Sequence, residues 1–184
     1  MNTFLKQLMA ILLIVALGVF VYSYLNDGFQ KPKSPKKTVS FKVDELKLEV
    51  FYNRPSKRGR EIFGALVPYN EVWRTGANEA TTFETNKALK IVNDSLEAGK
   101  YTLWTIPNDT AWQVIFNAKQ YEWGVDHTTL KPLREPNFDV VKVLVPVKKI
   151  DHVVEQFTIA FDNSTDNLFL TMAWDNVKIE VPLK

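Results

Sequence analysis

The hydrophobic and polar positions of this chain follow three successive patterns. Residues 8–25 read LMAILLIVALGVFVYSYL, an apolar run without a charged residue. Residues 26–37 read NDGFQKPKSPKK, a polar stretch with one glycine and two prolines that is typical of a linker. From residue 38 onward, apolar and polar positions tend to alternate, which is the period of a half-buried β-strand. The pattern predicts an apolar helix within residues 1–25, a linker at 26–37 and a β domain at 38–184.

The alternation is clearest at residues 46–53 and 176–183. Further strand-like runs, separated by turn residues, lie at 81–86, 89–93, 101–106, 112–117, 140–146, 153–161 and 168–174. We expect Trp104, Trp112 and Trp174, which lie on such runs, to be core residues. A short turn or helix is expected within 60–73, and a long irregular segment at 119–137. Eight to ten short strands at near-regular spacing indicate an all-β fold, an antiparallel β-sandwich or a flattened barrel.

The apolar run is long enough to cross a lipid bilayer. As a helix, residues 8–25 would measure about 27 Å, close to the ~30 Å hydrocarbon core. We expect an uncleaved membrane anchor. A cleaved signal peptide is the alternative, although Val21-Tyr22-Ser23 is a poor cleavage site. The four lysines of residues 31–37 favour a cytoplasmic domain, whereas a run that begins almost at the N-terminus is typical of export signals.

The charge and residue counts exclude several kinds of partner and metal site. The chain has 184 residues and a formal net charge of +2, but residues 38–184 hold 18 Lys+Arg against 20 Asp+Glu, a net charge of −2. The basic excess therefore belongs to the linker, which argues against a nucleic-acid partner. With no cysteine and only two histidines, thiolate and three-histidine metal sites are excluded. We expect neither a metal nor a cofactor, and the oligomeric state stays open.

Arginine is the most unevenly placed residue, with four of the five between positions 54 and 74. Its rigid fork of donors suits carboxylates, phosphates and sugar hydroxyls. The stretch continues as Trp73-Arg74-Thr75-Gly76-Ala77-Asn78-Glu79, a polar mixture that is costly to bury unless a ligand or its own members satisfy it. The predicted ligand-binding residues are Arg54, Arg60, Trp73, Arg74, Thr75, Asn78, Glu79 and Trp123. Glu79 is the candidate general acid/base, with Glu61 second. The alternative is an internal polar network that pins a long loop to the sheet.

Several motifs together resemble the signature of the bacterial DUF2911 family. They read YNRPS at 52–56, KRGREIFG at 57–64, LVPY at 66–69, VWRTGANEAT at 72–81, AGKYTLWTIP at 98–107, WQVIFN at 112–117 and Trp123-Gly124. The resemblance implies a β-rich domain of unknown function that usually follows an export signal, hence an extracytoplasmic domain, and it supplies no catalytic residues. Two departures are Asn70, where many members have glycine, and the long N-terminal apolar segment.

Three functions remain open from the sequence. The first is a membrane-tethered extracytoplasmic module that binds a small polar or anionic ligand, such as a glycan or a carboxylate, at the Arg/Trp/Asn/Glu cluster. The second is a hydrolase-like enzyme in which Glu79 acts as general acid/base and arginines stabilise developing negative charge. The third is a purely structural envelope protein, in which the cluster would be closed on itself.

Overall fold

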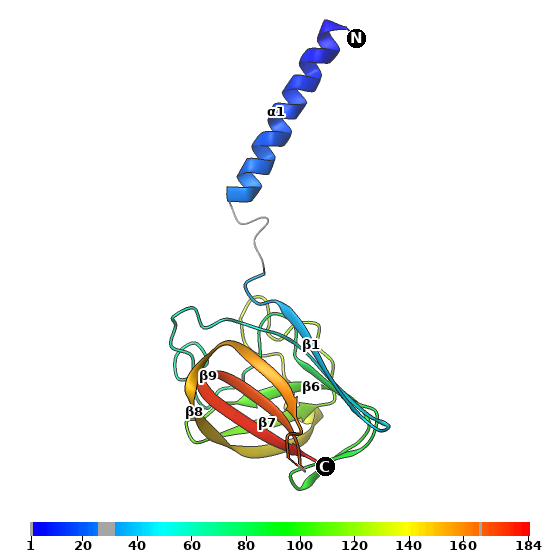
Figure 1. The fold of residues 1–184 in the computed structure, drawn as a ribbon, viewed down its shortest axis with the longest axis vertical. Helices are drawn as coiled ribbons and strands as arrows, with labels where there is room; N and C mark the ends of the chain where they lie inside the picture. Colours follow the sequence, from blue (N-terminus) through cyan, green and yellow to red (C-terminus); the bar gives the residue numbers. More distant parts are fainter. Residues whose placement is uncertain (1, 26–31, 166) are drawn as a thin grey trace. The chain divides into compact units, whose positions relative to one another are not determined.

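The computed structural model describes residues 2–25, 32–165 and 167–184. The chain divides into two compact units, Met1–Pro32 and Lys33–Lys184 (Figure 1). The first unit contains helix α1 (Thr3–Leu25), which has no buried residue and is long and apolar enough to cross a membrane. Most of the predicted linker, residues 26–31, lies outside the described residues. Strand β1 already begins at Lys36, two residues inside the predicted linker.

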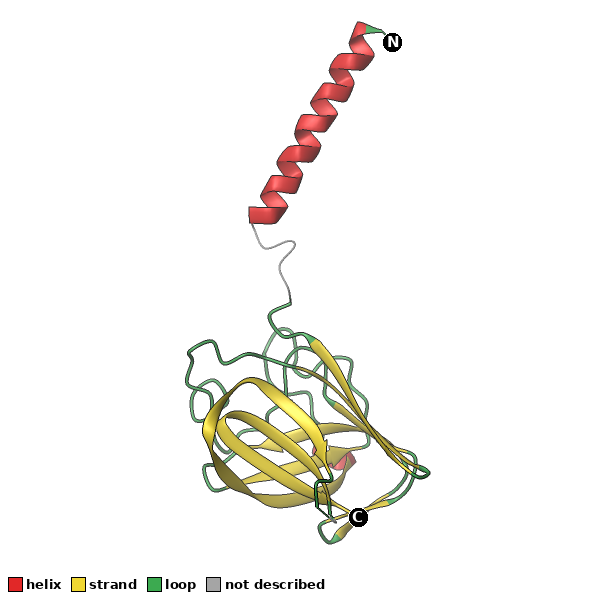
Figure 2. Ribbon diagram, viewed as in Figure 1, coloured by secondary structure: helices red, strands yellow, loops and turns green. Residues whose placement is uncertain are grey.

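The second unit is built on one antiparallel sheet, which confirms the predicted all-β class (Figure 2). The described residues form nine strands in the order β1-β2-β3-β6-β7-β8-β9-β4-β5, and the sheet does not close into a barrel. A short 3-10 helix, η1 (Pro136–Phe138), precedes β8. The strands are β1 (Lys36–Val43), β2 (Leu46–Asn53), β3 (Thr82–Thr85), β4 (Leu89–Ile91), β5 (Asp94–Leu96), β6 (Gly99–Ile106), β7 (Ala111–Asn117), β8 (Asp139–Asp162) and β9 (Leu168–Leu183).

Two pairs of predicted strands are in fact single long strands. The runs at 140–146 and 153–161 are both part of β8, and those at 168–174 and 176–183 are both part of β9. β8 pairs with β7 as far as Pro146 and with β9 from Val147 onward, so it belongs to both halves of the sheet. Register shifts on either side of Val154 interrupt its ladder with β9. Such irregularities bend a strand without ending it, which explains why the hydrophobic alternation is broken there.

The core lies where the sheet folds back on itself. The Tyr52 ring of β2 meets Phe157 of β8 edge to face at 5.8 Å, and Phe83 of β3 lies 6.5 Å from Phe161 of β8. The Tyr52 hydroxyl donates to the Ile159 carbonyl (3.3 Å) and accepts from the Ile159 N–H (3.0 Å). The three tryptophans predicted to be core residues are buried as expected: Trp104, Trp112 and Trp174.

The segments between β2 and β3 and between β7 and β8 are irregular. Residues 60–73 form turns and isolated bridges, including Phe63 with Val67, where a turn or a short helix was expected. Asn70 has a φ of 64°, a left-handed conformation that asparagine tolerates better than most residues. Its N–H donates to the Pro107 carbonyl (2.8 Å), which ties the turn to the end of β6. Residues 119–135 are irregular as predicted.

Candidate functional site

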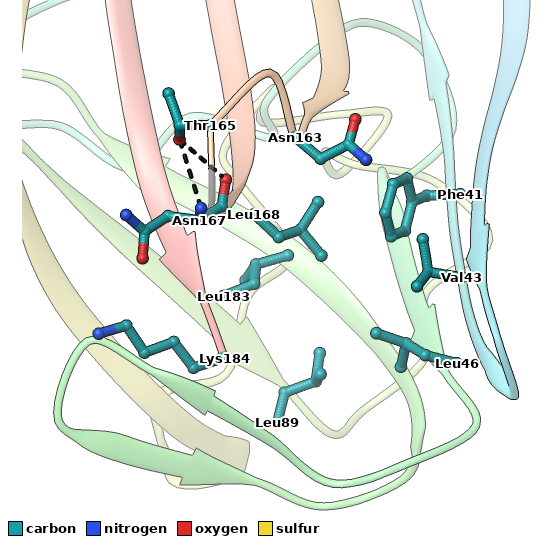
Figure 3. Close-up of a pocket in the computed structure, with 10 residues that line it drawn as sticks. All are labelled: Phe41, Val43, Leu46, Leu89, Asn163, Thr165, Asn167, Leu168, Leu183 and Lys184. Atoms are coloured by element: carbon teal, nitrogen blue, oxygen red, sulfur yellow. Dashed lines mark hydrogen bonds between the residues drawn. The ribbon is translucent and has the colours of Figure 1, made fainter.

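A cavity of about 490 Å³ lies beside the β1–β2 turn, and none of the predicted site residues lines it (Figure 3). Its apolar side chains are Phe41, Val43, Leu46, Leu89, Leu168 and Leu183. Asn163, Thr165 and Asn167 of the β8–β9 connection add polar groups, and among the described lining residues only Lys184 has a charged side chain. A specific site needs convergent polar groups as well as apolar area, so this cavity is the weaker candidate.

A second cavity, of about 340 Å³, brings together four of the residues predicted from the sequence: Arg60, Trp73, Arg74 and Asn78. Lys33, Arg58 and Trp174 line it as well. We call this cavity the arginine pocket. Its described lining carries four cationic side chains and no carboxylate. The lining is therefore electropositive, and its cations come from two segments, the residues before β1 and the connection between β2 and β3.

Arg74 is the most unusual member of the pocket. Its Nε atom is buried without a hydrogen-bond acceptor, and no ion pair to Arg74 occurs among the described residues. Burial, with no opposing charge to offset it, lowers the pKa of the guanidinium. A Cβ at Gly124 would come within 2.4 Å of Arg74 Cδ and 2.7 Å of its Cβ, so the arginine stem lies directly against the glycine. A half-buried cation without a counter-ion is costly unless a ligand supplies the negative charge.

Arg58 and Arg60, two further cations of the pocket lining, are held by backbone carbonyls. Arg58 Nη2 donates to the Lys33 carbonyl (2.9 Å), and Arg60 donates to the carbonyls of Lys57 (3.0 Å) and Ser56 (2.6 Å). These acceptors are neutral carbonyl groups, so they do not offset the positive charge of either guanidinium group. The supporting loop is fixed in turn by the Lys57 N–H, which donates to the Glu155 carbonyl of β8 (2.7 Å).

Two indole rings form an apolar wall of the pocket. Trp73 and Trp174 are stacked, with ring centroids 6.0 Å apart and planes inclined by 15°. Trp73 also meets Phe157 edge to face at 4.8 Å. Its backbone exchanges two hydrogen bonds with Thr105 of β6, at 2.7 and 3.0 Å. The indole that bounds the pocket is thus anchored both to the core and to the sheet.

The remaining predicted residues of this motif build the loop. Thr75 is fully buried, and its hydroxyl lies 3.1 Å from that of Thr105. The Thr81 hydroxyl donates to the Thr75 carbonyl (2.7 Å), and the Asn78 carbonyl accepts from the Gly124 N–H (3.0 Å). Thr75 and Asn78 both have positive φ values, 55° and 57°. These contacts are the internal polar network that was the alternative interpretation of the motif.

Glu79 does not line the arginine pocket. Its carboxylate pairs with Lys36 Nζ (2.6 Å) and accepts from Asn53 Nδ2 (2.8 Å). The hydrogen bond from Lys36 is the largest influence on the pKa of Glu79, which lies below its ordinary value. The carboxyl group is therefore ionised at neutral pH and cannot act as a general acid there. This geometry favours a structural role, joining the start of β1 to the loop.

Arg54 and Trp123 also lie outside the pocket lining. Arg54 donates to the Phe157 carbonyl (3.3 Å) and to the Thr158 hydroxyl (3.0 Å), so it fastens the loop to β8. Trp123 contacts the His127 ring, at a centroid distance of 5.3 Å. The pocket instead depends on its neighbour Gly124. Among the described residues, no three histidine, aspartate or glutamate side chains come together to hold a metal ion.

Sequence reasoning missed Lys33, Arg58 and Trp174 as pocket residues. Arg58 belongs to the arginine cluster of positions 54–74. Trp174 lies on a strand-like run, and its sequence context indicates only a core residue. Comparisons with the curated proteins and with the solved structures found no match to the chain. A family model described as "Protein of unknown function (DUF2911)" matches residues 34–183, most of the chain. The chain therefore belongs to the DUF2911 family.

Proposed function

We propose that this protein is a membrane-tethered domain that binds a small anionic ligand in the arginine pocket. The observation that carries the proposal is Arg74, a half-buried cation whose Nε has no acceptor and which has no counter-ion among the described residues. Proteins rarely leave a desolvated charge unpaired, because the cost is several kcal/mol. A ligand anion would supply the missing partner, and the indole wall would contact its apolar part.

Calorimetric titration of the full-length chain in a zwitterionic detergent tests this function. The probes are benzoate, glucuronate and phenyl phosphate, with benzyl alcohol as a neutral probe of similar size. We expect at least one anion to bind and benzyl alcohol not to bind. Arg74→Met should weaken anion binding by at least about tenfold, since a hydrogen bond to a charged group contributes about 1.5–3 kcal/mol.

Lys90→Met is the matched control, because it removes one positive charge from an exposed position on β4, away from the arginine pocket. Binding should be unchanged in this variant. Equal weakening in the two variants would show that only the net charge attracts the anion. Binding of benzyl alcohol as tight as that of benzoate would contradict a role for charge altogether.

The tether is proposed to be α1, with the domain on the extracytoplasmic side. Support comes from the length and apolar composition of the helix and from its place at the N-terminus. Because the chain has no cysteine, a single Ser164→Cys substitution on an exposed loop allows labelling from one side of the membrane. A membrane-impermeant maleimide should label this variant in intact spheroplasts. Labelling only after lysis would place the domain in the cytoplasm, and a mature mass lacking α1 would indicate a cleaved signal.

No observation favours the hydrolase alternative. Glu79 is paired with Lys36 and Asn53 and lies outside the pocket lining, and its pKa is lowered, which suits neither a general acid nor a strong base.

A further inference from the structure

Beyond the proposed anion binding, and resting on it, we propose that the group recognised by the arginine pocket is a phosphate monoester. The carrying observation is that Lys33, Arg58, Arg60 and Arg74 line one cavity without a carboxylate among its described residues. A phosphate monoester carries a charge of about −1.5 to −2 at pH 7 and presents three terminal oxygens. A carboxylate carries one charge and presents two oxygens in one plane.

Two acidic side chains, Asp175 and Glu79, are paired with lysines that do not line the pocket, whereas Glu155 is bonded only to a neutral backbone group and keeps its charge beside Arg58. Asp175 pairs with Lys57 at 2.5 Å. Glu155 accepts the backbone N–H of Arg58 at 2.8 Å. Glu79, as described above, is paired with Lys36. With four cations in the lining and one such carboxylate beside it, the pocket still carries more positive charge than a monoanion offsets and matches a dianion better.

The donors come from more than one place along the chain. Arg58, Arg60 and Arg74 belong to the single connection between β2 and β3, with the first two near its start and Arg74 further along, and Lys33 belongs to the segment that enters the domain. One arginine fork suffices for a planar carboxylate. Four cations from two segments suit a tetrahedral group, whose oxygens point in different directions. The Arg58–Lys33 carbonyl hydrogen bond (2.9 Å) holds the two segments together.

The remainder of the ligand would lie on the apolar wall. Trp73 is partly exposed and is stacked on the buried Trp174, and Leu66 and Pro55 extend the apolar surface. A cavity of about 340 Å³ falls at the small end of the range for ligand sites. It fits a phosphate attached to a single ring or to a short chain. Phenyl phosphate is the simplest probe that combines both features.

The test compares phenyl phosphate with benzoate, which has the same ring and a different anion, on the full-length chain in zwitterionic detergent. At pH 7.5 we expect phenyl phosphate to bind at least tenfold more tightly than benzoate. Because the second pKa of a phosphate monoester is about 6, its dianion fraction falls about fourfold between pH 7.5 and pH 5.5. The affinity for phenyl phosphate should fall by that factor, while that for benzoate should not.

The described lining contains neither a histidine nor a carboxylate, so it has no type of side chain whose ordinary pKa lies near this range. Arg74→Met should abolish the preference for phenyl phosphate, and Lys90→Met should keep it. Equal affinity for the two probes, or phenyl phosphate affinity independent of pH, would overturn the phosphate assignment while leaving anion binding intact. If neither phenyl phosphate nor any other anion binds, the proposed function itself fails.

A phosphate monoester could be a soluble metabolite or the headgroup of phosphatidic acid. Phenyl phosphate titrations in phosphatidylcholine nanodiscs, with and without phosphatidic acid, separate these sources. Weaker apparent binding in the discs with phosphatidic acid would indicate that the lipid headgroup competes for the pocket. Unchanged binding would support a soluble phosphate monoester. Loss of phenyl phosphate binding in both kinds of disc would contradict the proposal.

Discussion

Replacing Arg74 with methionine should stabilise the fold while removing the binding function. The guanidinium is half-buried, and its Nε has no acceptor. Methionine keeps an unbranched stem against Gly124 and removes the charge. An isolated ion in a protein interior costs several kcal/mol, and partial exposure to water reduces this cost. We therefore expect a gain of about 0.5–2 kcal/mol, the range typical of a single stabilising substitution.

The same substitution at Arg134 should have the opposite sign. Arg134 donates to both oxygens of Asp139, at 3.0 and 2.5 Å, and the Asp139 side chain is 1% exposed. Its removal leaves a buried carboxylate with Asn117 as a hydrogen-bond donor (2.9 Å) and with Lys142 at 3.9 Å. Breaking a buried pair in this way costs about 3–5 kcal/mol. The partners that remain favour the lower end of that range.

Urea unfolding of the full-length chain in detergent, followed by tryptophan fluorescence, measures both changes. In thermal unfolding of a domain of this length, a change of about 1 kcal/mol in stability shifts the midpoint temperature by roughly 2–4 °C. Arg74→Met should therefore raise the midpoint temperature by about 1–8 °C. Arg134→Met should lower it. If Arg74→Met is instead destabilised as much as Arg134→Met, the Arg74 guanidinium has a stabilising partner within the fold. The argument for a ligand anion would then be refuted.

Three further predictions concern the scaffold. Gly124→Ala should displace Arg74 and lower the free energy of unfolding by about 1–3 kcal/mol, as overpacking does. It should also weaken anion binding in the calorimetric titration, and normal binding would show that the arginine stem can move aside. Because the folded-state pKa of Glu79 is lowered, its ionised form stabilises the fold above its ordinary pKa of 4.5, and this contribution is lost as the pH falls through the folded value. The stability difference between wild type and Glu79→Gln in urea unfolding should accordingly shrink from pH 7 to pH 3, and a constant difference would contradict the ion pair with Lys36. Tyr52→Phe removes the donor to the Ile159 carbonyl and the acceptor of the Ile159 N–H, so urea unfolding should show a loss of about 1–3 kcal/mol, whereas no loss would mean that water replaces the hydroxyl.

The sequence predicted the all-β class because period-two alternation survives in most strands. The alternation did not predict β1, because its residues KKTVSFKV include lysine at three of eight positions. Lysine is common on edge strands, where it discourages pairing with other chains, and β1 is such an edge. It also failed along β8, where the ladder shifts near Val154 look like a turn in a single sequence. Local alternation cannot distinguish a bend in a strand from its end.

The candidate site was predictable only as far as one motif reaches. Trp73, Arg74 and Asn78 are close in sequence, and the unusual mixture of residue types pointed to them. Within the same motif, Thr75 and Glu79 turn away from the pocket, because the loop contains residues with positive φ that no simple periodicity describes. Lys33 and Trp174 come from opposite ends of the domain and meet only in the folded sheet.

The most direct test of the central claim is an NMR titration that observes the arginine Nε–H groups of the full-length chain in detergent. The chain has five arginines, so the resonances can be assigned by single substitutions. The account predicts that the Arg74 Nε–H resonance moves when phenyl phosphate or benzoate is added, because the anion becomes the counter-ion of the guanidinium group to which this N–H belongs. The Arg134 Nε–H resonance should not move, because this group already donates a hydrogen bond to Asp139. An Arg74 resonance that does not respond to either anion at saturating concentration would contradict the arginine pocket as an anion site.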